Sequence, residues 1–146
     1  MITCSAVSKR YPQGLEALKE VSFEISAGEM VYLSGHSGAG KSTLFRLLAA
    51  IERPTSGSIV VNGQNLAALR KSAIPYLRRN IGLIFQDHKL LFDRSALDNV
   101  LLPLAIVGLS AKDASRRAYA ALDKVGLHGR ENAHPIALSG GEQQRL

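Results

Sequence analysis

The sequence predicts a mixed α/β fold: antiparallel strands near the N-terminus, a glycine-rich loop between a strand and a helix, and a helical region at the C-terminal end. Its 146 residues, 46% apolar and 21% charged, are enough for one folded domain with a sizeable core. Up to residue 86, short β-branched stretches alternate with turn residues. Beyond Asp87 the apolar residues follow helical spacing, and helix-capping patterns appear.

The first part of the chain contains four strand candidates and one helix candidate. The strand candidates are "VSFEIS" (21–26), "MVYLSG" (30–35), "SIVVNG" (58–63) and "IGLIFQ" (81–86). The second runs directly into the glycine-rich loop, after which Leu44, Leu47, Leu48 and Ile51 recur at helical spacing. Pro54 and Gly57 then end the helical pattern, so the order predicted around the loop is strand, loop, helix.

Two helices are predicted in the second part, each opened by a serine with an acidic residue three positions later. Ser95 with Asp98 opens the first, which Pro103 must kink or end. Ser110 with Asp113 opens the second, which has alanine and leucine on one face and stops at Gly126. We therefore expect two domains, residues 1–86 and residues 87–146.

Charge and cysteine content narrow the class of protein. The net charge of +6 includes Arg70, Lys71, Arg78 and Arg79 around one short helical stretch. No aromatic residues alternate with these cations as base stacking would require, so we expect a solvated helix face and no nucleic-acid partner. The single cysteine, Cys4, is expected to be a small apolar strand residue. No apolar stretch is long enough to cross a bilayer, and no secretory signal is visible.

The stretch "GHSGAGKST", Gly35 to Thr43, has the pattern of a phosphate-binding loop placed between a strand and a helix. Its glycines let the backbone amides of residues 38–43 surround the phosphates of a nucleoside triphosphate. Lys41 adds a positive charge, and the Ser42 hydroxyl can bind Mg²⁺. The residues expected to hold the nucleotide here are Gly35, Ser37, Gly38, Ala39, Gly40, Lys41, Ser42 and Thr43.

The final stretch, "LSGGEQQRL", contains a second site that could face an anion. Ser139 and Glu142 form a further capping pair, and Gly140 and Gly141 leave backbone amides bare at the start of a helix. With "GHSGAGKST", the strand-terminal Gln86, and Tyr11 lying 24 residues before Gly35, these residues resemble the motifs of ATP-binding-cassette (ABC) ATPases. "SGHSGAGKSTL", "IERP", "LRRNIGLIFQDHKLLFDR" and "LDNV" are most similar to members of that family that act in bacterial cell division.

The resemblance implies a P-loop NTPase fold, an ABC nucleotide-binding domain with ATP and Mg²⁺ as ligands. Tyr11 would stack on adenine, and Gln86 would contact Mg²⁺ or the attacking water. Gln86 and Lys41 would therefore be the catalytic residues. Ser139, Gly140 and Gly141 would act in trans across a head-to-tail homodimer. The region after Asp87, including His88 and Lys89, would dock on an integral membrane partner at the cytoplasmic face of the bacterial inner membrane.

The resemblance also implies groups that this sequence does not contain. The Asp-Glu pair that ends an apolar strand in the family, and a later switch histidine, would both follow the signature; His128 and His134 precede it. We therefore expect an N-terminal fragment of a longer ATPase in which the C-terminal part of the sheet is missing. By itself it should bind MgATP weakly or not at all and should not hydrolyse it.

Several alternatives remain open from the sequence. A GTPase or small-molecule kinase would share the loop but would leave "LSGGEQQR" unexplained, and no Asn-Lys-x-Asp guanine motif is present. A DNA-maintenance ATPase would fit the basic charge but generally has long insertions between the two phosphate motifs. The chain could also serve a related lipoprotein or peptide exporter, or be a catalytically inactive binding module.

Overall fold

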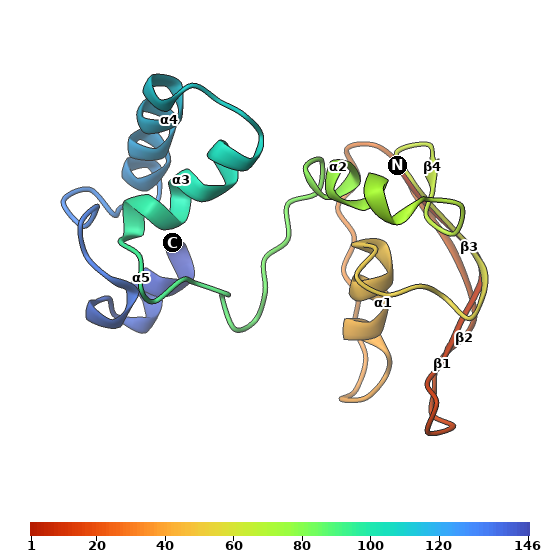
Figure 1. The fold of residues 1–146 in the computed structure, drawn as a ribbon. Coiled ribbons are helices and arrows are strands. Elements are labelled where there is room, and N and C mark those ends of the chain that lie inside the picture. Colours follow the sequence, from red (N-terminus) through yellow and green to blue (C-terminus); the bar gives the residue numbers. More distant parts are fainter. The chain divides into compact units, whose positions relative to one another are not determined.

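The computed structural model describes all of residues 1–146 and divides them into two compact units, Met1–Leu83 and Ile84–Leu146 (Figure 1). Each unit is described by itself. The first combines a small antiparallel sheet with short helices, and the second is helical. None of the helices is both long and apolar enough to span a bilayer.

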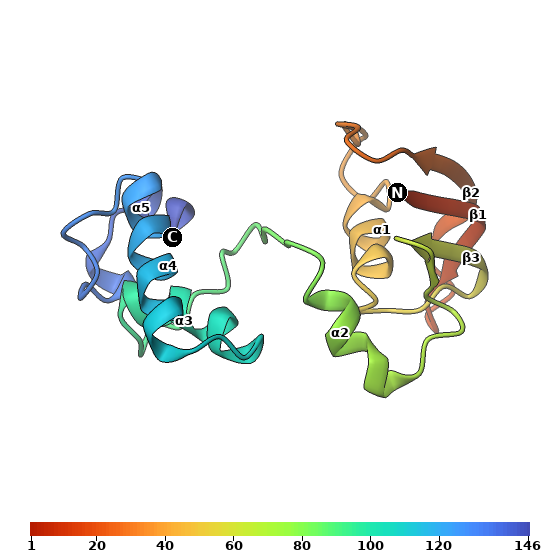
Figure 2. The same cartoon turned by 90° about the horizontal axis from the view of Figure 1, so that it is seen from above.

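The sheet of the first unit has the strand order β2-β1-β3-β4, and all neighbouring strands are antiparallel. The strands are β1 (Ile2–Arg10), β2 (Glu16–Ile25), β3 (Ser56–Val61) and β4 (Gln64–Asn65). Helix α1 (Lys41–Leu48) lies beside this sheet, and the short η1 (Lys71–Ala73) and α2 (Ile74–Arg78) follow β4 (Figures 1 and 2). The predicted N-terminal antiparallel strands are thus confirmed.

Strand β1 was not predicted as a strand, because its alternation is interrupted at Ala6, where it pairs irregularly with β2. Ala6 and Glu20 both have positive φ, and the register between β1 and β2 shifts around them. Hydroxyl groups replace the missing ladder partners: Ser22 accepts a hydrogen bond from the Ala6 amide at 2.8 Å, and Ser8 accepts one from the Glu20 amide at 2.9 Å. Bulges of this kind conceal the period-2 pattern by which a strand is recognised.

The core of the first unit lies between the sheet and α1. The buried residues of this cluster are Cys4, Val7, Leu18, Leu44, Leu47, Ile59, Val61, Leu66 and Leu77. Cys4 is buried as expected, and burial raises the pKa of its thiol. Leu44 and Leu47 supply the apolar stripe of α1, whereas Ile51 lies beyond the helix end and is exposed, so the predicted helix was too long by one turn.

Two of the predicted strands do not form. Residues 30–35 and 81–86 pair with no other strand, and Met30 and Tyr32 are 81% and 88% exposed. Their near-continuous apolar character is typical of strands buried on both faces of a parallel sheet, which need neighbours on both sides. The only sheet here is the antiparallel one, so these apolar residues have no strand neighbours to cover them.

The second unit consists of α3 (Ala96–Ile106), α4 (Ala111–Lys124), η2 (Pro135–Ala137) and α5 (Gly140–Arg145). Both predicted helix starts are confirmed, since Ser95 accepts a hydrogen bond from the Asp98 amide and Ser110 accepts one from the Asp113 amide. Pro103 lies inside α3 and does not end it. The carbonyl of Asn99, four residues earlier, therefore lacks its usual helical donor.

The packing of this unit centres on α3 and α4, which lie side by side (Figure 2). Its buried residues are Ala96, Ala114, Ala118, Leu122, Leu127, Pro135 and Leu138. The first amides of α3 are paired with the loop that follows α4: Ala96 donates to Ala133 at 2.8 Å and Leu97 donates to Glu131 at 2.9 Å. Helix α3 is therefore anchored through backbone groups as well as through apolar contacts.

A single carboxylate, Glu52, joins β1 to α1 in the first unit. Its side chain accepts a hydrogen bond from the Tyr11 hydroxyl at 2.9 Å and lies 3.3 Å from the Lys9 ammonium and 3.4 Å from the Arg46 guanidinium. Partial burial acts to raise the pKa of Glu52, but the hydrogen bonds from Tyr11 and Lys9 and the charge of Lys9 hold it below the ordinary value of 4.5. The ionised form is the one that the fold stabilises.

We predict that Glu52→Gln destabilises the first unit by about 1 kcal/mol at neutral pH, because a carboxylate with several donors becomes a neutral amide. The folded-state pKa of Glu52 is lowered, so this contribution is present above pH 4.5 and is lost as the pH falls through the lowered value. Thermal unfolding followed by circular dichroism should show a lower melting temperature for Glu52→Gln than for the native chain at neutral pH. The difference should disappear in acid.

The matched control for this experiment is Glu24→Gln, which removes an exposed carboxylate from β2. It should change stability little at any pH. A deficit of Glu52→Gln that stays the same in acid would show that the ionised carboxylate is not the stabilising group.

Candidate functional site

The glycine-rich loop closes directly against the sheet. Gly40, the residue before α1, has φ +85°, and a Cβ placed on it would lie 2.3 Å from the Ala17 carbonyl oxygen and 2.8 Å from the Leu18 side chain on β2. Only a residue without a side chain fits here. This approach fixes the first turn of α1 beside β2, and with it the direction in which Lys41, Ser42 and Thr43 leave the loop.

Lys41 folds back over the mouth of this loop. Its ammonium donates hydrogen bonds to the Gly35 carbonyl at 2.6 Å and the His36 carbonyl at 2.7 Å. The positive charge is therefore held by neutral acceptors, with no carboxylate beside it. The start of α1 adds the partial positive charge of a helix N-terminus, and its first turn contains no acidic residue. Positive potential thus gathers at this loop, as binding of a phosphate requires.

The remaining loop residues are open to solvent. Ser37, Gly38, Ala39 and Ser42 are exposed, and His36 contacts only the Ser37 carbonyl, at 2.7 Å from its Nδ1 atom. The sequence expectation that Gly35 to Thr43 forms one continuous loop and helix start is met by this geometry. The contacts of these residues with a nucleotide stay a prediction.

Tyr11 lies at the side of the same loop. Its hydroxyl lies 3.4 Å from the Thr43 hydroxyl as well as 2.9 Å from Glu52, and the Lys9 ammonium lies 5.1 Å from the centre of its ring. The structure thus brings Tyr11 together with the phosphate-binding loop, although the two are more than twenty residues apart in sequence. Glu52, which sequence reasoning did not single out, holds this ring in place; its position in "IERP" was the only available signal.

The second motif forms the capped start of α5. Ser139 accepts a hydrogen bond from the Glu142 amide, and the Glu142 carboxylate accepts one from the Ser139 amide at 2.8 Å, so the predicted capping box is present. Hydrogen bonds from the Ser139 backbone and hydroxyl hold the pKa of Glu142 below its ordinary range. Gln143 donates to the carbonyls of Pro135 and Leu138 and thereby ties α5 to the preceding turn. Gly140 and Gly141 are exposed.

Gln86 stands in a turn near the start of the second unit, and its side chain is exposed. The next residue, Asp87, forms an ion pair with Lys89 that lowers the pKa of its carboxyl. His88 and Lys89 both have positive φ, an uncommon conformation for residues with side chains. Gln86 and the Ser139 motif belong to one unit, whereas Lys41, Ser42 and Tyr11 belong to the other.

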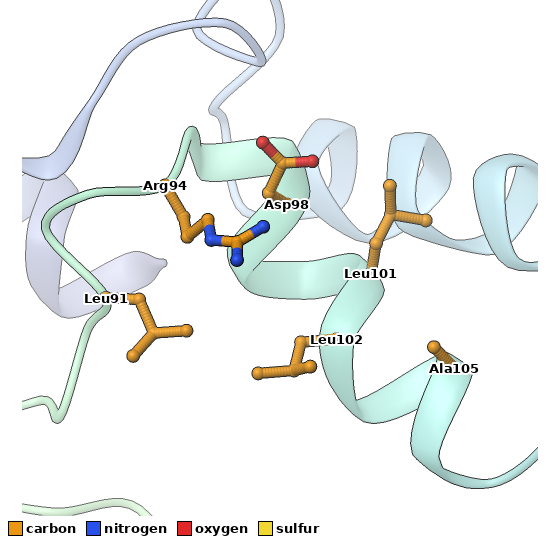
Figure 3. A pocket seen from close by; sticks show the side chains of 6 residues that line it. All are labelled: Leu91, Arg94, Asp98, Leu101, Leu102 and Ala105. Atoms are coloured by element: carbon orange, nitrogen blue, oxygen red, sulfur yellow. The ribbon is translucent and has the colours of Figure 1, made fainter.

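A groove of about 230 Å³ on the second unit was not predicted from the sequence. Its lining residues, from α3 and the segment before it, are Leu91, Arg94, Asp98, Leu101, Leu102 and Ala105. Figure 3 shows the leucine side chains of this groove together with Arg94 and Asp98. Asn99 shapes the groove, since its side chain accepts a hydrogen bond from the Leu91 amide at 2.8 Å and donates to the Leu91 carbonyl at 3.0 Å.

Comparisons with known proteins agree with the motifs. Residues 18–146 match the family described as ABC transporter. The cell division ATP-binding protein FtsE of Escherichia coli (strain K12) is 53% identical over 146 residues, which are 100% of this chain and 66% of that protein. FtsE of Bacillus subtilis (strain 168) is 42% identical, with 100% of this chain and 64% of the relative covered. The chain therefore spans about two thirds of the length of these curated relatives.

Solved structures show the same relationship. A dimeric bacterial ABC transporter cassette matches with a TM-score of 0.92 at 35% identity, covering 99% of this chain and 66% of that one. A dimeric ATP-binding cassette in a post-hydrolysis state, bound to ADP and Pi, matches with a TM-score of 0.91 at 34% identity over the same shares. These matches confirm the predicted fold class. The chain has the pattern of a phosphate-binding loop, a capped serine-glycine helix start and a family match over residues 18–146. It therefore belongs to the ABC transporter family.

Proposed function

We propose that this chain is the ATP-binding part of an ABC-type complex that couples ATP binding and hydrolysis to an integral membrane partner, of the FtsX type, in bacterial cell division. The observation that carries the proposal is the loop from Gly35 to Thr43, closed on β2 by Gly40 and faced by the Lys41 ammonium. The identity of 53% to a cell division ATP-binding protein over the whole chain supports the cellular role.

ATP and Mg²⁺ fit the chemistry of the residues around this loop. The backbone amides of the loop and of the first turn of α1, the Lys41 ammonium and the positive end of α1 suit a triphosphate. The Ser42 hydroxyl offers a neutral oxygen ligand of the kind that Mg²⁺ accepts. In this proposal the Gln86 amide would supply a further oxygen to Mg²⁺ or orient the attacking water. Mg²⁺ held by these residues would neutralise charge at the phosphates. Tyr11, held by Glu52, would stack on the adenine ring.

The capped helix start would complete the site from a second copy of the chain. In this proposal Ser139, Gly140 and Gly141 of one protomer face Lys41 and Ser42 of its partner across the terminal phosphate. The capping box satisfies the Glu142 amide and leaves the amides of the two exposed glycines available. Two of the structural relatives are dimers, which supports this arrangement.

Lys41→Ala should weaken MgATP binding by at least about 10-fold, because a charge-assisted contact to phosphate is lost at a site that holds no other lysine. Binding should be weak and should require millimolar MgATP. The control is Lys19→Ala, which removes an exposed lysine from β2 and should not change the affinity. Isothermal titration calorimetry or nuclear magnetic resonance titration measures the MgATP affinity of each variant. Equal binding by Lys41→Ala and Lys19→Ala, or preference for GTP, would contradict the assignment.

We also propose that these 146 residues alone do not turn over ATP. Phosphoryl transfer to water needs a metal-holding carboxylate close to the nucleotide. No Asp-Glu pair ends an apolar strand in this sequence, and the carboxylate joined to Tyr11, Glu52, is already held by three donors. Steady ATP turnover that disappears in Lys41→Ala would overturn this part of the proposal.

The apolar groove on α3 is the surface that we assign to the membrane partner. Leu91 and Leu102 are 40% and 45% exposed within it, and Phe92 beside it is 56% exposed. His88 and Lys89, which precede the groove, both have positive φ, and this strained stretch would transmit the state of Gln86. Binding there would place the chain at the cytoplasmic face of the inner membrane as a peripheral subunit.

Leu102→Glu should abolish co-purification of the chain with an FtsX-type membrane protein expressed beside it, because an ionised side chain would have to lose its water on docking. Ile136→Glu is the matched control, since Ile136 is an exposed apolar residue of the same unit outside the groove. MgATP binding should be unchanged in both variants. Retention of the partner by Leu102→Glu and its loss in Ile136→Glu would move the docking surface away from the groove.

A further inference from the structure

We propose that a basic groove on the first unit binds anionic phospholipid headgroups. The groove, of about 450 Å³, lies between the end of α1 and the η1–α2 segment. The residues that line it are Ala50, Ile51, Arg53, Lys71, Ile74, Pro75 and Arg78. Its lining residues differ from those of the nucleotide loop and of the apolar groove on α3. The proposal goes beyond the proposed function because it needs neither ATP nor a protein partner.

The groove collects positive charge that no carboxylate neutralises. Between Glu52 and Asp87 the chain has five basic residues and no acidic one. Three of the five, Arg53, Lys71 and Arg78, line the groove, and Arg70 and Arg79 are their chain neighbours. The nearest acid in sequence, Glu52, is occupied by Lys9, Tyr11 and Arg46. The groove therefore attracts anions.

Two of the arginines are positioned by neutral backbone groups. Arg78 donates to the carbonyls of Ala49 at 3.2 Å and Ala50 at 2.9 Å, at the C-terminal end of α1. Arg53 donates to the Leu69 carbonyl at 2.8 Å. Carbonyl partners fix the two guanidinium groups without cancelling their charge, and each guanidinium keeps further N–H donors for a phosphate. An ordinary solvated helix face does not require such fixed arginines.

The apolar part of the groove favours a lipid over a purely polar anion. Ala50, Ile51, Ile74 and Pro75 form its apolar lining, and Ile51 is 45% exposed. On α2 the ring of Tyr76 is 65% exposed and lies 5.0 Å from the Arg79 guanidinium. Basic residues together with exposed aliphatic and tyrosine side chains suit the boundary between headgroups and acyl chains. Nucleic acid would need several stacking aromatics, and α2 offers one.

Sedimentation with vesicles tests the proposal. The chain should bind phosphatidylcholine vesicles that contain phosphatidylglycerol, and should not bind phosphatidylcholine alone, at an ionic strength of about 0.15 M. Arg70→Gln with Lys71→Gln should weaken this binding about 25-fold, since each basic residue near an anionic surface contributes about 5-fold. This pair is chosen because its side chains have no hydrogen bond to the fold, unlike Arg53 and Arg78.

The control pair is Lys112→Gln with Arg117→Gln, which removes the same charge from exposed positions on α4. It should leave vesicle binding unchanged. Ile51→Asn, which keeps the charge, should weaken vesicle binding about 5-fold through the lost apolar contact. Circular dichroism checks that each variant is folded, and MgATP titration should give the same affinity for all of them, which separates this proposal from the nucleotide site.

Four results would overturn the proposal. The first is no binding of the native chain to phosphatidylglycerol vesicles. The second is an equal loss of vesicle binding in the groove pair (Arg70→Gln with Lys71→Gln) and in the control pair on α4. The third is complete displacement by millimolar inorganic phosphate with no effect of Ile51→Asn, which would identify a site for soluble phosphate. The fourth is tighter binding to duplex DNA than to vesicles, lost in the groove pair, which would identify a nucleic-acid surface.

Discussion

The close contact of Gly40 with β2 is the constraint on which the candidate site depends. A loop that presents its amides to a phosphate has to turn sharply and then enter a helix, and that geometry needs a fixed support. Here the support is the backbone of Ala17, so near to Gly40 that no side chain fits between them. The sheet thereby determines where α1 begins, and α1 determines where Lys41, Ser42 and Thr43 stand.

The second element of the site depends on charge rather than on close packing. Glu52 follows α1, and its carboxylate reaches back to Lys9 and Tyr11 at the end of β1. The same carboxylate contacts Arg46 within α1, so strand, helix and ring share one ionised group. Its low pKa is the expected consequence of several donors around one acid. Tyr11 can therefore stay beside Thr43 without being buried in the core.

The sequence predicted the local features well and the long-range ones poorly. The loop, α1 and the three serine-capped helix starts follow from nearby residues, so their patterns can be read directly, and the structure confirms those helix starts. Strand β1 was missed because the irregularity at Ala6, where its register with β2 shifts, breaks the alternation of residues. Residues 30–35 and 81–86 have the composition of buried parallel strands, but strand formation also requires partners, which composition does not reveal.

The contacts of Glu52 and the basic groove were out of reach of sequence reasoning for the same reason. Glu52 meets Lys9 and Tyr11 across about forty positions of the chain, and Arg53 joins Lys71 and Arg78 only once α2 has folded beside the end of α1. Arg70, Lys71, Arg78 and Arg79 read as an ordinary solvated face when α2 is considered alone. The basic groove is recognised only in the folded structure, where the carbonyls of Ala49 and Ala50 accept hydrogen bonds from Arg78.

Amide hydrogen exchange of the chain, with and without millimolar MgATP, tests the central claim most directly. If the loop closed by Gly40 is the phosphate site, protection should increase at the amides of residues 38–43 and little elsewhere in the first unit, and should need Mg²⁺ for its full extent. Unchanged exchange in this loop at every concentration, or protection centred on the basic groove around Arg78, would contradict the account.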